Sequence, residues 1–71
     1  MDKNKLIDLL NEDLETEYRS IVQYVTHIAT IKGAEYMAIV KELKSHVSQE
    51  LEHAMTLAEQ IDFLGGEPTT T

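Results

Sequence analysis

Apolar residues recur along this chain at alternating steps of three and four positions, the spacing that places side chains on one face of an α-helix. Apolar or aromatic side chains fill all but two positions of two such stripes. The pattern is typical of helices that pack in a bundle. The first stripe occupies positions 10, 14, 17, 21, 24, 28 and 31, and the second occupies positions 36, 40, 43, 47, 50, 54, 57, 61 and 64.

Two breaks divide the chain into helices. Gly33 is the sole glycine or proline before position 65, where the sequence Gly-Gly-Glu-Pro forms a typical helix stop. The pattern predicts one all-α domain over residues 1–71, with helices over about 4–31 and about 34–64 and a tail over 65–71. Because the connection is short, the helices should pair as an antiparallel two-helix hairpin. We expect the polar Thr-Thr-Thr end of the tail to be disordered.

The two exceptions in the stripes are both glutamates, Glu17 in the first and Glu50 in the second. Glu17 lies 16 residues before Gly33, and Glu50 lies 17 residues after it. At a rise of 1.5 Å per residue, both lie roughly 25 Å from the turn. We therefore expect the two carboxylates to meet on the buried side of the hairpin, with His53 one helical turn beyond Glu50.

None of the six basic side chains falls at a stripe position near these carboxylates. Two unpaired carboxylates at one depth would cost several kcal/mol or force one to bind a proton. A divalent metal ion is the simplest neutralising partner, with Glu17, Glu50 and His53 as its ligands. The alternative is a non-enzymatic acidic hairpin that dimerises and whose core glutamates only fix the register of the helices.

A second copy of the chain is also expected, because two helices cannot cover both apolar stripes and four can. A homodimer with two-fold symmetry would bring together two copies of Glu17, Glu50 and His53. Four carboxylates and two imidazoles form an oxygen-rich set that suits iron or manganese. Their four negative charges balance two divalent cations.

Composition narrows the class of protein further. The formal net charge is −7, which disfavours nucleic acid as a partner. The chain has no Cys, which removes thiolate ligands and fits a reducing, cytoplasmic compartment. No stretch has the apolar length needed to span a membrane, so no membrane partner is expected.

Glu on one helix followed by Glu-x-x-His on the next resembles the half-site of the ferritin-like di-iron carboxylate proteins. The stretches LNEDLETEYRSIVQYVTHIA and SQELEHAMTLAEQIDFLGGEP look like the first two helices of the bacterioferritin branch. The resemblance implies a ferritin-like four-helix bundle with Glu17 and Glu50 as carboxylate ligands. Glu50 is favoured as the bridge between two metal ions, and His53 as a terminal nitrogen ligand.

Two further residues are candidates for supporting roles. The resemblance places Tyr24 near the site, as a hydrogen-bond donor to a carboxylate or as a plain core aromatic. His46 precedes Glu50 by one helical turn and is a candidate auxiliary ligand, although histidines on a helix face are more often solvated. His27 lies near the turn, and we expect it on the flank of the hairpin.

The chain also departs from the family pattern. Members usually carry four helices and a second Glu-x-x-His in one chain, so either two copies make the site, as in the two-helix encapsulated-ferritin type, or this chain is the first half of a longer protein. Bacterioferritins resemble one another in a Met directly after the motif Glu, where this chain has Leu51. We therefore predict no haem.

These features predict a ferroxidase that oxidises Fe(II) for iron storage or detoxification. We expect two iron ions per dimer, with manganese or zinc as alternatives, and a higher homo-oligomer, cage or capsule that receives the oxidised iron. A di-manganese centre that decomposes peroxide is the alternative reaction, because ligand sets of this kind overlap.

Overall fold

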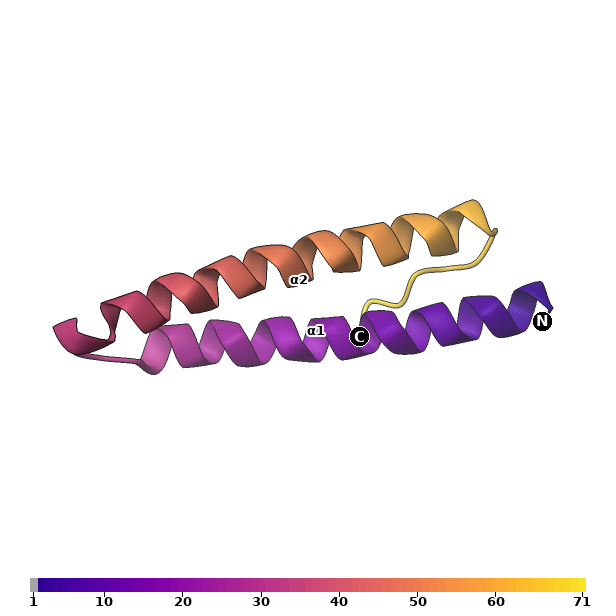
Figure 1. Ribbon diagram of the computed structural model, residues 1–71. Helices are drawn as coiled ribbons and strands as arrows, with labels where there is room; N and C mark the ends of the chain where they lie inside the picture. Colours follow the sequence, from indigo (N-terminus) through magenta and orange to yellow (C-terminus); the bar gives the residue numbers. More distant parts are fainter. Residues whose placement is uncertain (1) are drawn as a thin grey trace.

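The computed structural model describes residues 2–71 and shows two long antiparallel helices joined at one end (Figure 1). Helix α1 spans Lys3–Thr30, the 3-10 turn η1 spans Ala34–Tyr36, and helix α2 spans Met37–Phe63. The molecule is elongated, with extents of 51 × 17 × 16 Å. The predicted all-α hairpin is confirmed. Within residues 2–71, neither helix has the length of apolar sequence that crossing a membrane requires.

The connection between the helices is made by a glycine and a tight 3-10 turn. Gly33 has a φ of 106°, a backbone conformation that residues with a Cβ atom rarely adopt. The Tyr36 amide then donates to the Gly33 carbonyl at 3.1 Å, which winds Ala34–Tyr36 more tightly than an α-helix. The second α-helix therefore begins at Met37, three residues later than the predicted start.

Helix α2 ends in a Schellman motif that turns the chain back towards α1. The Gly66 amide donates to the Ile61 carbonyl at 2.9 Å, and the Gly65 amide donates to the Asp62 carbonyl at 2.9 Å. Gly65 has a φ of 85°, as the residue after the helix end in this motif commonly does. Together these bonds satisfy the last carbonyls of α2 and set the direction of the tail.

The tail over residues 65–71 docks on α1. The Thr69 amide donates to Asn11 Oδ1 at 2.8 Å, while Asn11 Nδ2 donates to the Glu67 carbonyl at 3.1 Å. The Tyr18 hydroxyl donates to the Thr69 carbonyl at 3.0 Å. The expected disorder is therefore wrong, because polar side chains on α1 supply partners for the tail backbone.

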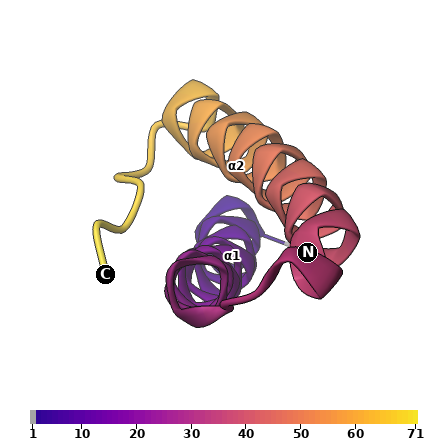
Figure 2. The same cartoon turned by 90° about the vertical axis from the view of Figure 1, so that its left-hand side faces the viewer.

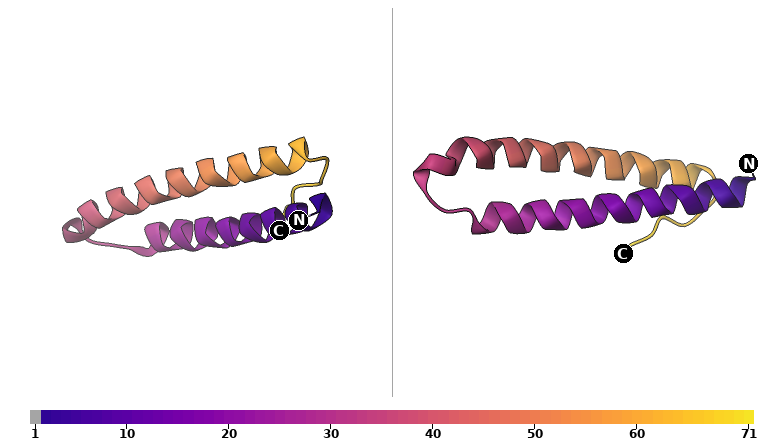
Figure 3. Two further views of the ribbon diagram at one scale, coloured as in Figure 1. Left: turned by 45° about the vertical axis from the view of Figure 1, so that its right-hand side comes forward. Right: turned by 60° about the horizontal axis from the view of Figure 1, so that its bottom comes forward.

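The views agree on where the tail lies. Figures 1 and 3 show it running back from the end of α2 and stopping about halfway along α1. Figure 2 shows it on one side of the helix pair, with the opposite side left open.

The hydrophobic core lies between the two helices in the half of the hairpin that carries the chain ends. Leu14, Ala54, Leu57 and Ile61 are buried, and Leu14 and Ile61 are completely inaccessible. Full burial of a leucine or isoleucine side chain stabilises a fold by about 1.5–3 kcal/mol. Partly buried side chains pack around this cluster: Ile7, Leu10, Tyr18, Ile21 and Ala58.

Candidate metal centre

Glu17 and Glu50 lie at the middle of their helices. Glu17 is the fifteenth of the 28 residues of α1, and Glu50 is the fourteenth of the 27 residues of α2. Because the helices are antiparallel and almost equal in length, their midpoints lie side by side. The sequence therefore places both carboxylates at the centre of the hairpin, at the edge of the packed core.

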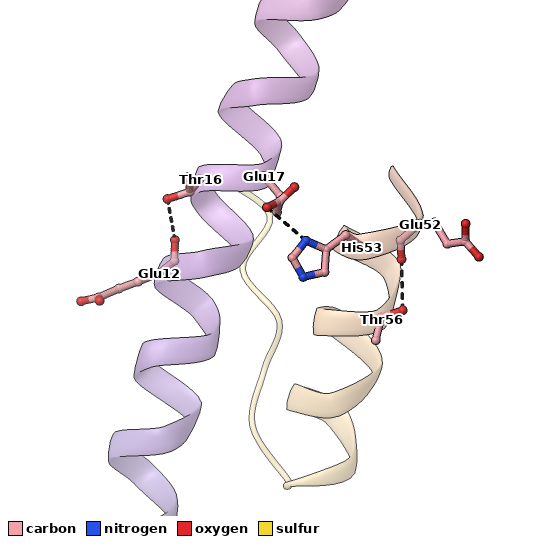
Figure 4. A network of polar contacts seen from close by, with 6 residues as sticks. All are labelled: Glu12, Thr16, Glu17, Glu52, His53 and Thr56. Carbon is pink, nitrogen blue, oxygen red and sulfur yellow. Dashed lines mark hydrogen bonds and ion pairs between the residues drawn. The ribbon is translucent and has the colours of Figure 1, made fainter. Parts of the chain in front are cut away.

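The structure brings Glu17, Glu50 and His53 together. One ligand atom from each side chain lies within 4.8 Å of the other two. The shortest contact joins His53 Nδ1 to Glu17 Oε1 at 3.2 Å. Figure 4 shows the imidazole of His53 reaching from α2 towards the carboxylate of Glu17 on α1. Glu50 precedes His53 by three residues, so one helix presents a carboxylate and an imidazole to the same point.

The three side chains differ in their access to solvent. The Glu17 side chain is only 15% exposed, whereas that of His53 is 59% exposed. Glu17 Oε2 is shielded from solvent and has no hydrogen-bond partner within residues 2–71. Buried carboxylate oxygens normally accept hydrogen bonds or bind a cation, because a bare one loses its hydration without compensation. This oxygen is therefore a free ligand position on the buried side of the site.

Electrostatics at the site also favour a bound cation. A hydrogen bond that Glu17 and Glu50 share when one is protonated raises the pKa of Glu17 above its ordinary value. Burial and the negative charge of Glu50 raise this pKa further, while His53 lowers it. When both carboxylates are ionised they have no proton to share and repel each other. A divalent cation would take the place of that proton and neutralise both groups.

The donor set fits iron or manganese. Two carboxylates and one imidazole are the ligands that these metals accept in proteins, and such a set leaves coordination positions open for further ligands. Carboxylates are hard donors that also suit magnesium or calcium, but the histidine nitrogen favours a transition metal.

The two supporting candidates form a pair of their own. The ring of Tyr24 stacks on that of His46, with centroids 6.1 Å apart and planes inclined by 9°. Tyr24 lies seven residues after Glu17 and His46 lies four before Glu50, so both lie on the turn side of the site and antiparallel pairing brings them together. The spacing placed both residues on the turn side of the site, but we expected separate roles and did not predict the stack. A role for either residue at the metal stays a prediction.

Other polar candidates lie apart from the site. His27 is exposed on α1, towards the turn. No group of three or more acidic or histidine side chains besides Glu17, Glu50 and His53 has metal-binding geometry within the described chain. The structure therefore has one candidate centre per chain in residues 2–71.

Comparison with known proteins agrees with this geometry. The ferritin-like domain family matches residues 7–71, and the chain therefore belongs to the ferritin-like family. It is similar to a bacterioferritin from Desulfovibrio desulfuricans (strain ATCC 27774), with 35% identity over 68 residues. That match covers 96% of this chain and 38% of the relative, so the chain spans about two-fifths of the length of this relative. No solved structure gives a significant match. The expected resemblance to the bacterioferritin branch is confirmed.

Proposed function

We propose that this chain binds iron and oxidises Fe(II) at a centre that two chains share. The observation that supports this most strongly is the buried, unpartnered oxygen of Glu17 beside a second carboxylate and an imidazole. A structural role alone would not explain why two acidic side chains converge at the edge of a small core. The membership of the ferritin-like family and the likeness to a bacterioferritin support iron as the metal.

Each side chain has a distinct part in this proposal. Glu17 supplies a negative charge on the buried side, where water does not compete with the ion for it. Glu50 supplies the second carboxylate and lies where it can bridge two ions. His53 is the most exposed of the three and would supply a nitrogen ligand on the solvent side of the site.

Binding of iron requires a change at the histidine. In this structure His53 Nδ1 lies 3.2 Å from Glu17 Oε1, a distance at which a protonated Nδ1 would donate to the carboxylate. A metal ligand must instead offer a lone pair, so coordination through Nδ1 would require the neutral tautomer that carries its proton on Nε2. Iron thus replaces the proton between these two side chains.

The redox chemistry belongs to the iron that is the substrate. Two Fe(II) ions give up one electron each, and the two electrons with two protons reduce one dioxygen to hydrogen peroxide, or one hydrogen peroxide to two waters. One chain supplies two carboxylates, so two chains supply the four negative charges that balance two Fe(II) ions. This is why the proposal needs a second chain.

Substitution of Glu50 tests the function directly. We expect Glu50→Ala to reduce the rate of Fe(II) oxidation to the rate in buffer, because it removes one ligand and leaves Glu17 alone with His53. Glu52→Ala is the matched control, since Glu52 is exposed on the same helix and lies outside the site. Oxidation should be followed by the near-ultraviolet absorbance of oxidised iron. Oxidation by the Glu50 variant at the wild-type rate would contradict the proposal.

One observation favours the alternative of a non-enzymatic helical module. The contact between Glu17 and His53 pairs a partly buried acid with a base, as a register-fixing pair would. The variant Glu17→Leu separates the two functions. If the acid only fixes register, Fe(II) should not stabilise the wild-type fold. If iron binds, Fe(II) should raise the melting temperature of the wild type and leave that of the variant unchanged.

A further inference from the structure

Tyr24 and His46 contact each other through the faces of their rings, which stack at 6.1 Å between centroids with planes inclined by 9°. Their polar atoms are not placed at the centre in the same way. Glu17 Oε2 has no hydrogen-bond partner within residues 2–71, so the Tyr24 hydroxyl does not donate to this oxygen. His46 is not among the side chains whose ligand atoms converge in the described chain. The contact that the structure does show is therefore the ring stack.

The stacked pair joins the two helices on the turn side of the carboxylates. Tyr24 lies seven residues after Glu17, roughly 10 Å along α1, and His46 lies four residues before Glu50, roughly 6 Å along α2. Spacings of four and seven residues keep side chains on the same face of a helix. The pair therefore lies on the side of the hairpin that carries Glu17 and Glu50.

The centre is closed differently towards its two ends. Towards the chain ends, the buried Leu14 lies three residues from Glu17 and the buried Ala54 lies four residues from Glu50. Towards the turn, none of the side chains of residues 18–49 is buried. Tyr24 is half-buried there, and the exposed ring of His46 covers one of its faces. A flat aromatic pair thus stands where the packed core is missing.

A polar cavity of about 270 Å³ adjoins this pair. Its lining consists of Ser20, Gln23, Tyr24, His27 and Leu43. Hydroxyl, amide and imidazole groups in such a lining hold water. Ser20 follows Glu17 by one helical turn, so this water lies close to the centre. Because Tyr24 belongs both to the cavity lining and to the stack, its ring is one boundary between the water and the gap between the helices.

We propose that the stacked rings of Tyr24 and His46 form the wall of the metal centre on its turn side and slow the loss of a bound ion. Tyr24 separates the cavity from the carboxylates, and His46 holds the Tyr24 ring in that position. The shell around a metal site controls the access of solvent to it, and an ion leaves when water replaces its protein ligands. Both residues act through ring faces, so neither the hydroxyl nor an imidazole nitrogen is needed. This inference rests on the proposed function only in that the site binds a divalent ion.

The rate at which Co(II) leaves the loaded protein tests this role. Co(II) accepts the same carboxylate and imidazole ligands as iron, and its visible absorbance changes on release to excess EDTA. Tyr24→Phe and His46→Phe keep a ring and lose the hydroxyl or the nitrogens, whereas Tyr24→Ala and His46→Ala lose the ring. Asn11→Ala is the control for stability, because it removes tail contacts away from the pair.

We expect Co(II) release from both alanine variants to be about 10–100-fold faster than from the wild type, the change that loss of a supporting residue commonly makes in metal affinity, and release from both phenylalanine variants to stay within about threefold. Release from either phenylalanine variant as fast as from the matching alanine variant would overturn the proposal, since a hydroxyl or a nitrogen would then be responsible. Wild-type rates in all four variants would also overturn it. Equally fast release from Asn11→Ala would do the same, because release would then follow stability.

This test is separate from the test of iron oxidation. A wild-type chain that binds Co(II) and releases it as expected, but does not oxidise Fe(II), would contradict the proposed function and leave the wall in place. A wild-type chain that binds no Co(II) would contradict the metal centre and the wall together.

Discussion

The two halves of this hairpin are built from the same pair of helices but differ in their packing. The half with the chain ends contains all the buried side chains: Leu14, Ala54, Leu57 and Ile61. In the half with the turn, residues 18–49, none of the side chains is buried, and Val22 and Met37 are 64% and 65% exposed. Both halves have the apolar periodicity of bundle helices, so periodicity alone does not explain the difference.

The tail accounts for part of this difference. In the half with the chain ends, residues 65–71 add a third segment, and a Cβ at Gly66 would lie 2.6 Å from Ile7 Cγ2, which shows how closely the tail packs. The half with the turn has no third segment within residues 2–71. Two helices bury only the stripes that face each other, and the other apolar positions of the half with the turn stay exposed. The second chain that the proposed shared centre requires would cover such positions.

Truncation of one apolar side chain in each half should give the largest contrast. Leu14→Ala removes a completely buried side chain, and we expect it to lower the free energy of unfolding by about 2–5 kcal/mol. Val25→Ala on the same helix removes an exposed side chain, and we expect a change within about 0.5 kcal/mol at concentrations where the chain is monomeric. Urea unfolding measures both. Equal losses of unfolding free energy in the two variants would mean that the two halves do not differ in packing.

Removal of the tail contacts should have a smaller effect. Asn11→Ala deletes the side chain that bonds to both Glu67 and Thr69, and each bond contributes about 0.5–1.5 kcal/mol. We expect the Thr69 amide to lose its protection from hydrogen exchange in this variant. Ser20→Ala, on the same helix but away from the tail, is the control. Unchanged protection of Thr69 in the Asn11 variant would show that the docked tail does not depend on this side chain.

A pH effect of smaller size is expected at the boundary between the halves, where Glu17 lies. Its folded-state pKa is raised above the ordinary value, so the metal-free fold holds this proton more tightly than the unfolded chain does. This contribution to stability is fully present below the ordinary carboxyl pKa and is lost as pH rises through the folded-state pKa.

Glu17→Gln removes that titration. We therefore expect the variant to gain stability relative to the metal-free wild type as pH rises from the ordinary carboxyl pKa through the raised folded-state pKa of Glu17. Urea unfolding at a series of pH values measures the difference. A constant difference across the series would show that Glu17 has an ordinary pKa in the fold.

Much of this structure was readable from the sequence, and the exceptions share a cause. The two helices follow from periodicity, and the meeting of Glu17 with Glu50 follows from their equal distance to Gly33. The tail was missed because it docks through backbone groups of Glu67 and Thr69, whose side chains form no apolar pattern. Hydrogen bonds that span 51–58 residues leave no local signal in a sequence.

The contrast between the halves also shows what sequence pattern cannot supply. Apolar residues at stripe positions predict that this face of a helix is buried. They do not identify the segment that buries it. Within residues 2–71 the tail covers one side of the helix pair in the half with the chain ends, and the opposite side has no such cover (Figure 2). The stacking of Tyr24 on His46 likewise depends on how the helices rotate about their axes, which the spacing of residues along each helix does not fix.

The most direct test of the central claim is an aerobic titration of metal-free protein with Fe(II), followed by the near-ultraviolet absorbance of oxidised iron. A centre of two irons shared by two chains predicts rapid oxidation with a break at one iron per chain. Glu52→Ala should give the same break, and Glu50→Ala should give none. Oxidation of the wild type no faster than in buffer, with no break, would contradict the claim and leave Glu17 and Glu50 as residues that fix helix register or bind another metal.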